Sequence, residues 1–329
     1  MVTSGRADRV RLHVVSGKGG TGKTTVAAAL ALALASGGAR VLLCEVEGRQ
    51  GIARLFDVPP LPYEERSIAV APGGGEVLAL AIEAEAALLE YLDMYYRLGR
   101  AGKALDRFGI IDFATTIAPG VRDVLLTGKV YEAARRRDRQ GEPRYDAIVL
   151  DAPPTGRITR FLNVNREVAG LAKAGPIRNQ ADAIMTLLRS RHTAVHLVTV
   201  LEDMPVQETV DGICGLRAAG LPVGRVMINM VRSSPLPEPA QRAVSAGLVA
   251  ADALDRSLGK AGLDVTPGLA DALLEETAHH LQRLALEEEQ RAKLVALDVP
   301  HIVLPQLYDG VDLGGLYDLA RQLRQQGLS

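Results

Sequence analysis

The sequence predicts an α/β fold, in which a doubly wound, mostly parallel sheet is accompanied by a helical subdomain. Short, predominantly apolar runs such as 41–44, 147–150 and 194–200 recur along the chain, with helical stretches between them. Strands of this kind are typical of a parallel sheet that helices cover on both faces. The second observation is a glycine-rich turn at residues 17–24, which follows the first apolar run and precedes an alanine- and leucine-rich segment.

The first elements are expected in the order strand, turn, helix, strand. Residues 12–15 form the first strand, and residues 26–35 favour a helix because alanine and leucine have high helix propensity. Ser36, Gly37 and Gly38 end that helix. Residues 41–44 form the next strand. Further buried strands are expected at 77–82, 147–150, 194–200, 225–228 and 301–304.

Two longer stretches, about 83–137 and 239–297, have the pattern of helices. Leu254 and Leu258, and then Leu269 and Leu273, lie four residues apart, which places each pair on one helical face. We expect both stretches to contribute the helical subdomain of a single domain that spans residues 1–329. At roughly 150 residues per domain, a chain of 329 residues also allows two domains.

Composition excludes several classes of protein. Lys and Arg number 38 and Asp and Glu 39, and the resulting net charge of −1 speaks against a nucleic-acid-binding protein. Two cysteines, Cys44 and Cys214, cannot form a disulfide framework, and we expect no structural zinc. The longest apolar stretch, 26–35, is too short for a membrane-spanning helix of about 20 residues. Because the N-terminus also lacks a signal-peptide core, we expect a cytoplasmic protein with no integral membrane segment.

The glycine-rich turn fits the phosphate-binding pattern G-x-x-x-x-G-K-[ST], in the strand–helix context that the pattern requires. Its backbone N–H groups and the positive end of the helix dipole can surround a phosphate. Lys23 is expected to reach the β- and γ-phosphates, and the Thr24 hydroxyl to bind Mg²⁺. We therefore expect ATP and Mg²⁺ as cofactors. The expected nucleotide contacts in and after the turn are Gly17, Gly19, Gly20, Thr21, Gly22, Lys23, Thr24 and Thr25.

A carboxylate is expected to complete the magnesium site. Asp151 directly follows the apolar run 147–150, so it lies at the carboxyl end of a strand, where an acid can hold the metal ion directly or through water. Pro153, Pro154 and Gly156 keep the next segment out of regular structure, so that it can move with the γ-phosphate. An Asp after a strand is also common as a cap, but the phosphate loop favours the metal-binding interpretation.

A second lysine, Lys18, makes the loop resemble the deviant Walker A motif of the ParA/MinD, nitrogenase iron protein and ArsA group of P-loop ATPases. Residues 151–162, Asp-Ala-Pro-Pro-Thr-Gly-Arg-Ile-Thr-Arg-Phe-Leu, resemble more narrowly the signature of ArsA and the guided-entry targeting ATPases, including the actinobacterial anion-transporting branch. The resemblance implies that ATP holds a dimer together, with Lys18 acting on the partner subunit's nucleotide. It also implies that Asn229 and the loop beginning at Pro305 contact adenine.

The segment after the second strand departs from the family pattern. Where the family has Asp-Pro, this chain has Glu47 and Gly48. The resemblance assigns Glu47 to the attacking water, which a Glu can orient. Its extra methylene moves the carboxylate by about an ångström, a displacement that can cost about 10²-fold in rate; the alternative is a solvated loop acid. The expected catalytic residues are Lys18, Lys23, Glu47 and Asp151, and the expected metal ligands are Thr24 and Asp151.

Two features of the family are missing from the sequence. The arsenite pumps use a cysteine cluster, and three thiolates are not available among two cysteines. The targeting ATPases join their subunits through a Cys-x-x-Cys zinc clamp after the adenine-contacting Asn, whereas residues 230–235 contain no cysteine. A dimer of this chain is therefore expected to depend on nucleotide and side-chain packing.

Three functions fit these observations. The first is a dimeric Mg-ATP-dependent ATPase, a hydrolase and switch of the ArsA/targeting type. It couples ATP binding and hydrolysis to a client protein or membrane partner. Its dimer is either a homodimer or a heterodimer with a paralogue. The second is a nucleotide-binding, non-catalytic subunit that pairs with a catalytic paralogue, which the Glu47 departure motivates. The third is a ParA/MinD-like positioning ATPase, which the net charge and the mixed C-terminal stretch 316–328 disfavour.

Overall fold

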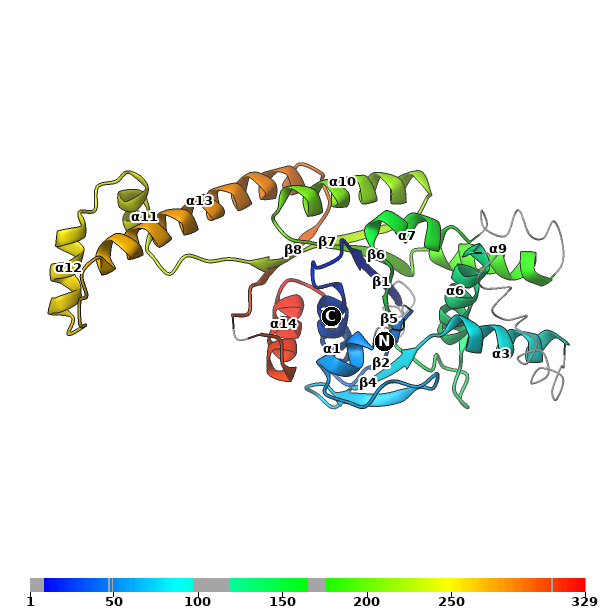
Figure 1. Cartoon of the computed structure of the whole chain (residues 1–329). Helices are drawn as coiled ribbons and strands as arrows, with labels where there is room; N and C mark the ends of the chain where they lie inside the picture. The colour runs from blue at the N-terminus through cyan, green and yellow to red at the C-terminus, as the bar shows by residue number, and fades with distance from the viewer. Residues whose placement is uncertain are drawn as a thin grey trace, which may run out of the picture.

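The computed structural model describes residues 9–328 apart from 47, 49, 97–118, 165–175 and 309. These residues contain an eight-stranded sheet with the order β3-β4-β2-β5-β1-β6-β7-β8 (Figure 1). Neighbouring strands run parallel except β3 and β4, which are antiparallel. The strands are β1 (Leu12–Gly17), β2 (Arg40–Glu45), β3 (Arg66–Val70), β4 (Glu76–Ala81), β5 (Ala147–Asp151), β6 (Thr193–Thr199), β7 (Val223–Val231) and β8 (His301–Pro305). The predicted α/β fold with a mostly parallel sheet is confirmed.

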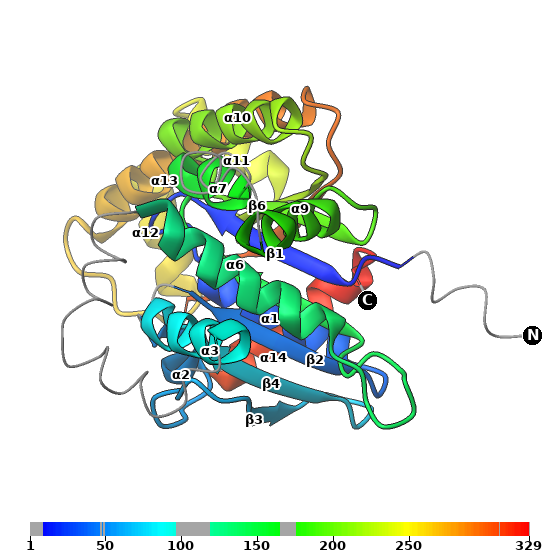
Figure 2. The same cartoon turned by 90° about the vertical axis from the view of Figure 1, so that its right-hand side faces the viewer.

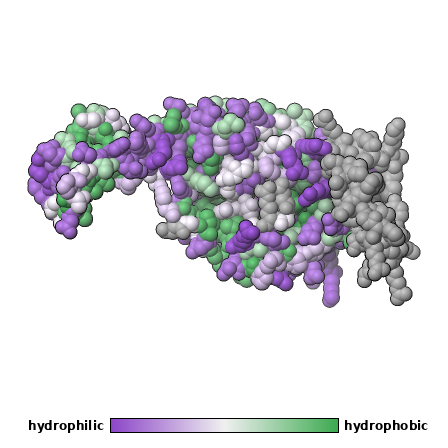
Figure 3. All heavy atoms as spheres, viewed as in Figure 1, coloured by the Kyte–Doolittle hydropathy of each residue, from purple (hydrophilic) through white to green (hydrophobic). Residues whose placement is uncertain are grey.

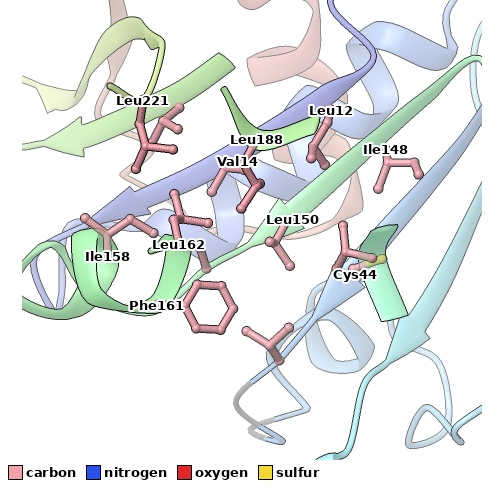
Figure 4. Close-up of a cluster of buried hydrophobic side chains, with 14 of the residues drawn as sticks. Leu12, Val14, Cys44, Ile148, Leu150, Ile158, Phe161, Leu162, Leu188 and Leu221 are labelled. Atoms are coloured by element: carbon pink, nitrogen blue, oxygen red, sulfur yellow. The ribbon is translucent and has the colours of Figure 1, made fainter. Parts of the chain in front are cut away.

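Helices cover both faces of the sheet (Figures 1 and 2). One face carries α1 (Lys23–Ala35), α2 (Gly51–Leu55) and α14 (Leu313–Gln325), and the other α6 (Pro119–Arg135), α7 (Thr155–Leu162), α9 (Pro176–Leu188) and α10 (Asp203–Ala218). Successive strand residues point to opposite faces, so Val14 belongs to the core under α7, shown in Figure 4, and Val15 to the core under α1. Residues 26–35 are buried on every side because α1 lies between the sheet and α14, which explains their uniformly apolar sequence.

The two predicted helical stretches lie at opposite ends of the molecule (Figure 1). In the first stretch, α3 (Ala84–Tyr96) packs against α6. In the second, α11 (Glu238–Ser245), α12 (Ala251–Lys260) and α13 (Leu269–Val295) form an arm that projects past β7 and β8. Leu248 and Leu263 are exposed there, and Figure 3 shows apolar side chains on the arm's surface. A shared helical subdomain within one domain of residues 1–329 stays a prediction.

The expected strands match seven of the eight that are described, and β3 is the strand that the sequence does not predict. It lies at the edge of the sheet, none of its residues is buried, and a register shift interrupts its pairing with β4. Such a strand needs no apolar run, so the sequence carries no strong signal for it. Among the described helices, none combines the length and hydropathy needed to cross a bilayer.

Two histidines stack against each other in the middle of the sheet. His13 of β1 and His196 of β6 have ring centroids 5.3 Å apart, and His13 Nδ1 lies 3.1 Å from His196 Nε2. The backbone N–H of Arg225 donates to His196 Nδ1 at 3.1 Å, so His196 carries its proton on Nε2 and donates it to His13 Nδ1. Only neutral rings can make both bonds. Burial lowers the pKa of His13 to about 4 and the pKa of His196 well below its ordinary value.

We expect this histidine pair to make the fold sensitive to acid. As the pH falls from 6.5 to about 4, the unfolded chain takes up protons that the folded chain does not bind. The free energy of unfolding therefore falls through this window and is unaffected above it. For His13 alone the loss corresponds to about 3 kcal/mol at the lower end.

Urea unfolding across this pH window measures the effect. The double variant His13→Gln/His196→Gln should lose less stability between neutral pH and pH 4 than the wild type does. The control is His279→Gln, which replaces an exposed histidine of α13 and should keep the wild-type dependence. Identical pH dependences in all three proteins would contradict the assignment.

Candidate functional site

The loop between β1 and α1 lies at the carboxyl edge of the sheet, where open α/β sheets bind their ligands. Gly20 and Gly22 have φ angles of 88° and 82°, a backbone conformation that favours glycine. At Gly19 and Gly20 an added Cβ would meet no atom within 4 Å, so the loop faces open space at these residues. The loop ends at the N-terminus of α1, where backbone N–H groups and the helix dipole favour an anion.

Hydrogen bonds within the loop hold it in this shape. The N–H and the Oγ1 of Thr21 both donate to the carbonyl of Lys18, at 3.3 and 2.8 Å. The ammonium of Lys23 donates to the same carbonyl at 3.5 Å, and its side chain is buried. Lys23 is thus held against the loop rather than in solvent. Thr25 follows in the first turn of α1 and is half-buried.

The two predicted metal ligands contact each other. Thr24 Oγ1 donates to Asp151 Oδ2 at 2.7 Å, and Asp151 is buried. Strand pairing brings this contact about, because Asp151 ends β5 beside Val15 of β1 and Thr24 follows the loop that leaves β1. Hydroxyl and carboxylate oxygens suit Mg²⁺. Within the described ranges, no three His, Cys, Asp or Glu side chains are grouped to hold a metal ion, so Mg²⁺ would need phosphate and water oxygens as well.

Lys18 contacts α10 of its own chain. Its Nζ lies 2.9 Å from Glu208 Oε1, and Thr155 Oγ1 donates to Glu208 Oε2 at 3.1 Å. Glu208 therefore joins the loop to the first residue of α7, in the segment that follows Asp151. The Lys18 and Glu208 side chains are 30% and 33% exposed, so this ion pair contributes at most about 1 kcal/mol. A second link, from Ser16 Oγ to the carbonyl of Pro153 at 2.6 Å, ties β1 to the same segment.

Asn229 lies at the other side of the loop. Its Nδ2 donates to the carbonyl of Thr21 at 3.0 Å, and its side chain is buried. An added Cβ at Gly22 would lie 2.4 Å from that nitrogen, which gives a second reason for glycine at this position. Pro305 ends β8 next to Val231 of β7, two residues beyond Asn229. Both predicted adenine contacts thus lie at the carboxyl edge of the sheet, and Asn229 contacts the loop directly.

The structure brings most of the predicted site together, whereas Glu47 lies outside the described residues. Three residues to which the sequence assigns no role in the site also belong to this region: Ser16, Glu45 and Glu208. Glu208 belongs to the segment 202–209, which follows the predicted strand 194–200, and this position is the sequence feature that points to it. Glu45 is the last residue of its strand, as Asp151 is, and Ser16 is the last but one of β1, so the same rule points to both.

Comparison with known proteins adds independent evidence. Residues 10–191 match the model of a family described as anion-transporting ATPase. ATPase BagA of Mycobacterium tuberculosis is 55% identical over 324 residues, which span 98% of this chain and 95% of that protein. The arsenical pump-driving ATPase of Acidiphilium multivorum is 25% identical over 318 residues, 92% of this chain and 53% of that protein. ATPase GET3 of Kluyveromyces lactis is 26% identical over 179 residues, 50% of each chain.

Proposed function

This chain belongs to the anion-transporting ATPase family, and from that premise we propose that it works as a dimeric, Mg²⁺-dependent ATPase switch. The family match and the ATPase relatives confirm the resemblance to ArsA-type ATPases, and with it ATP binding and hydrolysis. The observation that carries the magnesium part is the 2.7 Å hydrogen bond between Thr24 and Asp151, beside a glycine loop that faces open space.

Each predicted residue has a defined task in this proposal. The loop N–H groups bind phosphate oxygens, and Lys23 adds a positive charge beside them. Thr24 and Asp151 would hold Mg²⁺, which when bound neutralises charge on the phosphates. Glu47 is the residue that we propose to orient the attacking water. Asn229 and Pro305 are proposed to contact adenine, because Asn229 donates to the loop carbonyl of Thr21 and Pro305 ends β8 beside Val231, two residues beyond Asn229.

We propose that Lys18 acts on the nucleotide of a partner subunit. Within one chain it pairs with Glu208, so closing a dimer would exchange this carboxylate for phosphate charge. The exchange costs little, because the pair is partly exposed and weak. A lysine that reaches a γ-phosphate in trans would stabilise the charge of the transition state, as an arginine finger does.

The segment after Asp151 is the proposed route from the nucleotide to a client protein or membrane partner. Ser16 Oγ donates to the carbonyl of Pro153, and Thr155 donates to Glu208 on α10. A change in the contacts of Asp151 would therefore alter the contacts of both α7 and α10, which pack against each other. Conversion of such a local contact change into movement of a helix pair is a recurrent switch mechanism.

Turnover of Mg-ATP by the purified chain tests the proposal, with Lys23→Ala as the background. We expect turnover that EDTA abolishes, a dimer in light scattering when ATP is present, and a loss of about 10²-fold in kcat for Lys18→Ala. Glu208→Gln is the companion variant, because it frees Lys18 without removing it, and it should keep turnover. If Lys18→Ala hydrolyses ATP as fast as the wild type, Lys18 has no role in trans. ATP binding without turnover would instead favour a subunit that needs a catalytic paralogue.

A further inference from the structure

Glu45 is a buried carboxylate beside the proposed magnesium site. It is the last residue of β2 and is 3% exposed. Parallel pairing of β2 with β5 sets Glu45 directly opposite Asp151, so their side chains leave the sheet on the same side. Two acids therefore end neighbouring strands at the carboxyl edge, next to Thr24.

The two oxygens of Glu45 have different surroundings. Oε1 accepts a hydrogen bond of 3.0 Å from the backbone N–H of Gly51, the first residue of α2. Oε2 is buried and has no hydrogen-bond partner among the described residues. A buried carboxylate oxygen without a partner is costly, because it loses its hydration and gains nothing in return. Such a group at a ligand site indicates a partner that is a cation or a bound water.

Thr24 shares this environment with Glu45. A Cβ built on Gly51 would lie 3.8 Å from Glu45 Oε1, 3.8 Å from Thr24 Oγ1 and 3.1 Å from Thr24 Cγ2. The Glu45 carboxylate and the threonine hydroxyl that donates to Asp151 therefore lie within van der Waals reach of one point beside Gly51.

We propose that Glu45 is a third protein oxygen donor to the Mg²⁺ that accompanies ATP, through Oε2, while Oε1 fixes the start of α2. This inference rests on the proposed Mg²⁺-dependent function and adds a residue to the same site. Mg²⁺ takes hard oxygen ligands and keeps several waters, so one additional carboxylate can serve it directly or through a water. Glu45 also links the metal to the segment that carries Glu47.

Glu45→Gln separates this role from a purely structural one. The glutamine keeps an acceptor for the Gly51 N–H and removes the negative charge. ATP affinity is measured with a fluorescent ATP analogue in EDTA and across a Mg²⁺ titration, together with the Mg²⁺ dependence of turnover. We expect unchanged or tighter binding in EDTA, since a negative charge near the phosphates is removed. The Mg²⁺ concentration for half-maximal binding should rise about tenfold or more.

Two further variants make the test decisive. Glu45→Asp restores the charge on a shorter side chain and should recover part of the Mg²⁺ affinity. Glu76→Gln, at the start of β4 on the opposite edge of the sheet, is the matched control and should behave as the wild type. If Glu45→Gln loses ATP affinity equally with and without Mg²⁺, or leaves the Mg²⁺ titration unchanged, Glu45 is not a donor to Mg²⁺. Either result would leave the proposed magnesium-dependent function standing. A wild-type protein that ignores Mg²⁺ would overturn the proposed magnesium-dependent function as well.

Discussion

Replacing Asp151 by Asn is expected to lower kcat for ATP hydrolysis about 100-fold or more, while the protein stays folded. Asn keeps a carbonyl oxygen that can accept the Thr24 hydroxyl, whose bond to Asp151 is 2.7 Å long, so the variant removes the charge and little else. A neutral amide is a weaker Mg²⁺ ligand than a carboxylate. The loss should therefore be accompanied by a higher Mg²⁺ requirement, measured by titrating turnover with Mg²⁺.

Asp146→Asn is the matched control for this variant. It changes the same residue type just before the other end of β5, where Asp146 Oδ2 accepts the backbone N–H of Arg40 at 2.9 Å. Its turnover should equal that of the wild type, because Asp146 lies at the edge of the sheet opposite to the nucleotide loop. A kcat within threefold of wild type for Asp151→Asn would remove Asp151 from the metal site. Thermal unfolding of both variants excludes loss of fold as the cause.

The parts of the site that the sequence predicts are those in which residue type and strand position act together. The loop at 17–24 requires glycine where φ is positive, and lysine and threonine at fixed spacing, so its pattern is strong. The sequence predicts Asp151 because it directly follows an apolar run, and the parallel sheet brings it to Thr24. Both inferences depend on backbone geometry that local sequence determines.

The contacts of Lys18, Glu45 and Glu208 could not be predicted in this way. Glu208 lies 190 residues from Lys18 in sequence, and their meeting depends on how α10 packs over β1. The role of Glu45 depends on its register with Asp151 and on the burial of one oxygen, neither of which a single strand reveals. The same limit applies to the helical stretches 83–137 and 239–297. Their periodicity predicts helices, but it does not predict that the two stretches lie at opposite ends of the molecule.

The second large effect is expected at Gly17, the residue at which β1 enters the phosphate loop. A Cβ at this position would lie 2.2 Å from the carbonyl oxygen of Val198, its partner in β6, and 2.9 Å from Thr21 Oγ1. Gly17→Ala must therefore push β1 away from β6 and disturb the hydrogen bond from Thr21 Oγ1 to the Lys18 carbonyl, which closes the loop. We expect a loss of about 3 kcal/mol in the free energy of unfolding, together with weaker ATP binding.

Gly19→Ala makes this prediction specific to the backbone contact rather than to any loss of glycine in the loop. A Cβ at Gly19 meets no atom within 4 Å and its φ is not positive, so this variant should change the free energy of unfolding by less than about 0.5 kcal/mol. Urea unfolding without nucleotide compares the two, because ATP would add its own contacts to the loop. Equal stabilities for the two variants would mean that β1 and β6 can separate at Gly17 at little cost. In that case the glycine is required by the nucleotide, since phosphate oxygens approach the loop backbone, and the defect of Gly17→Ala should then appear in ATP binding alone.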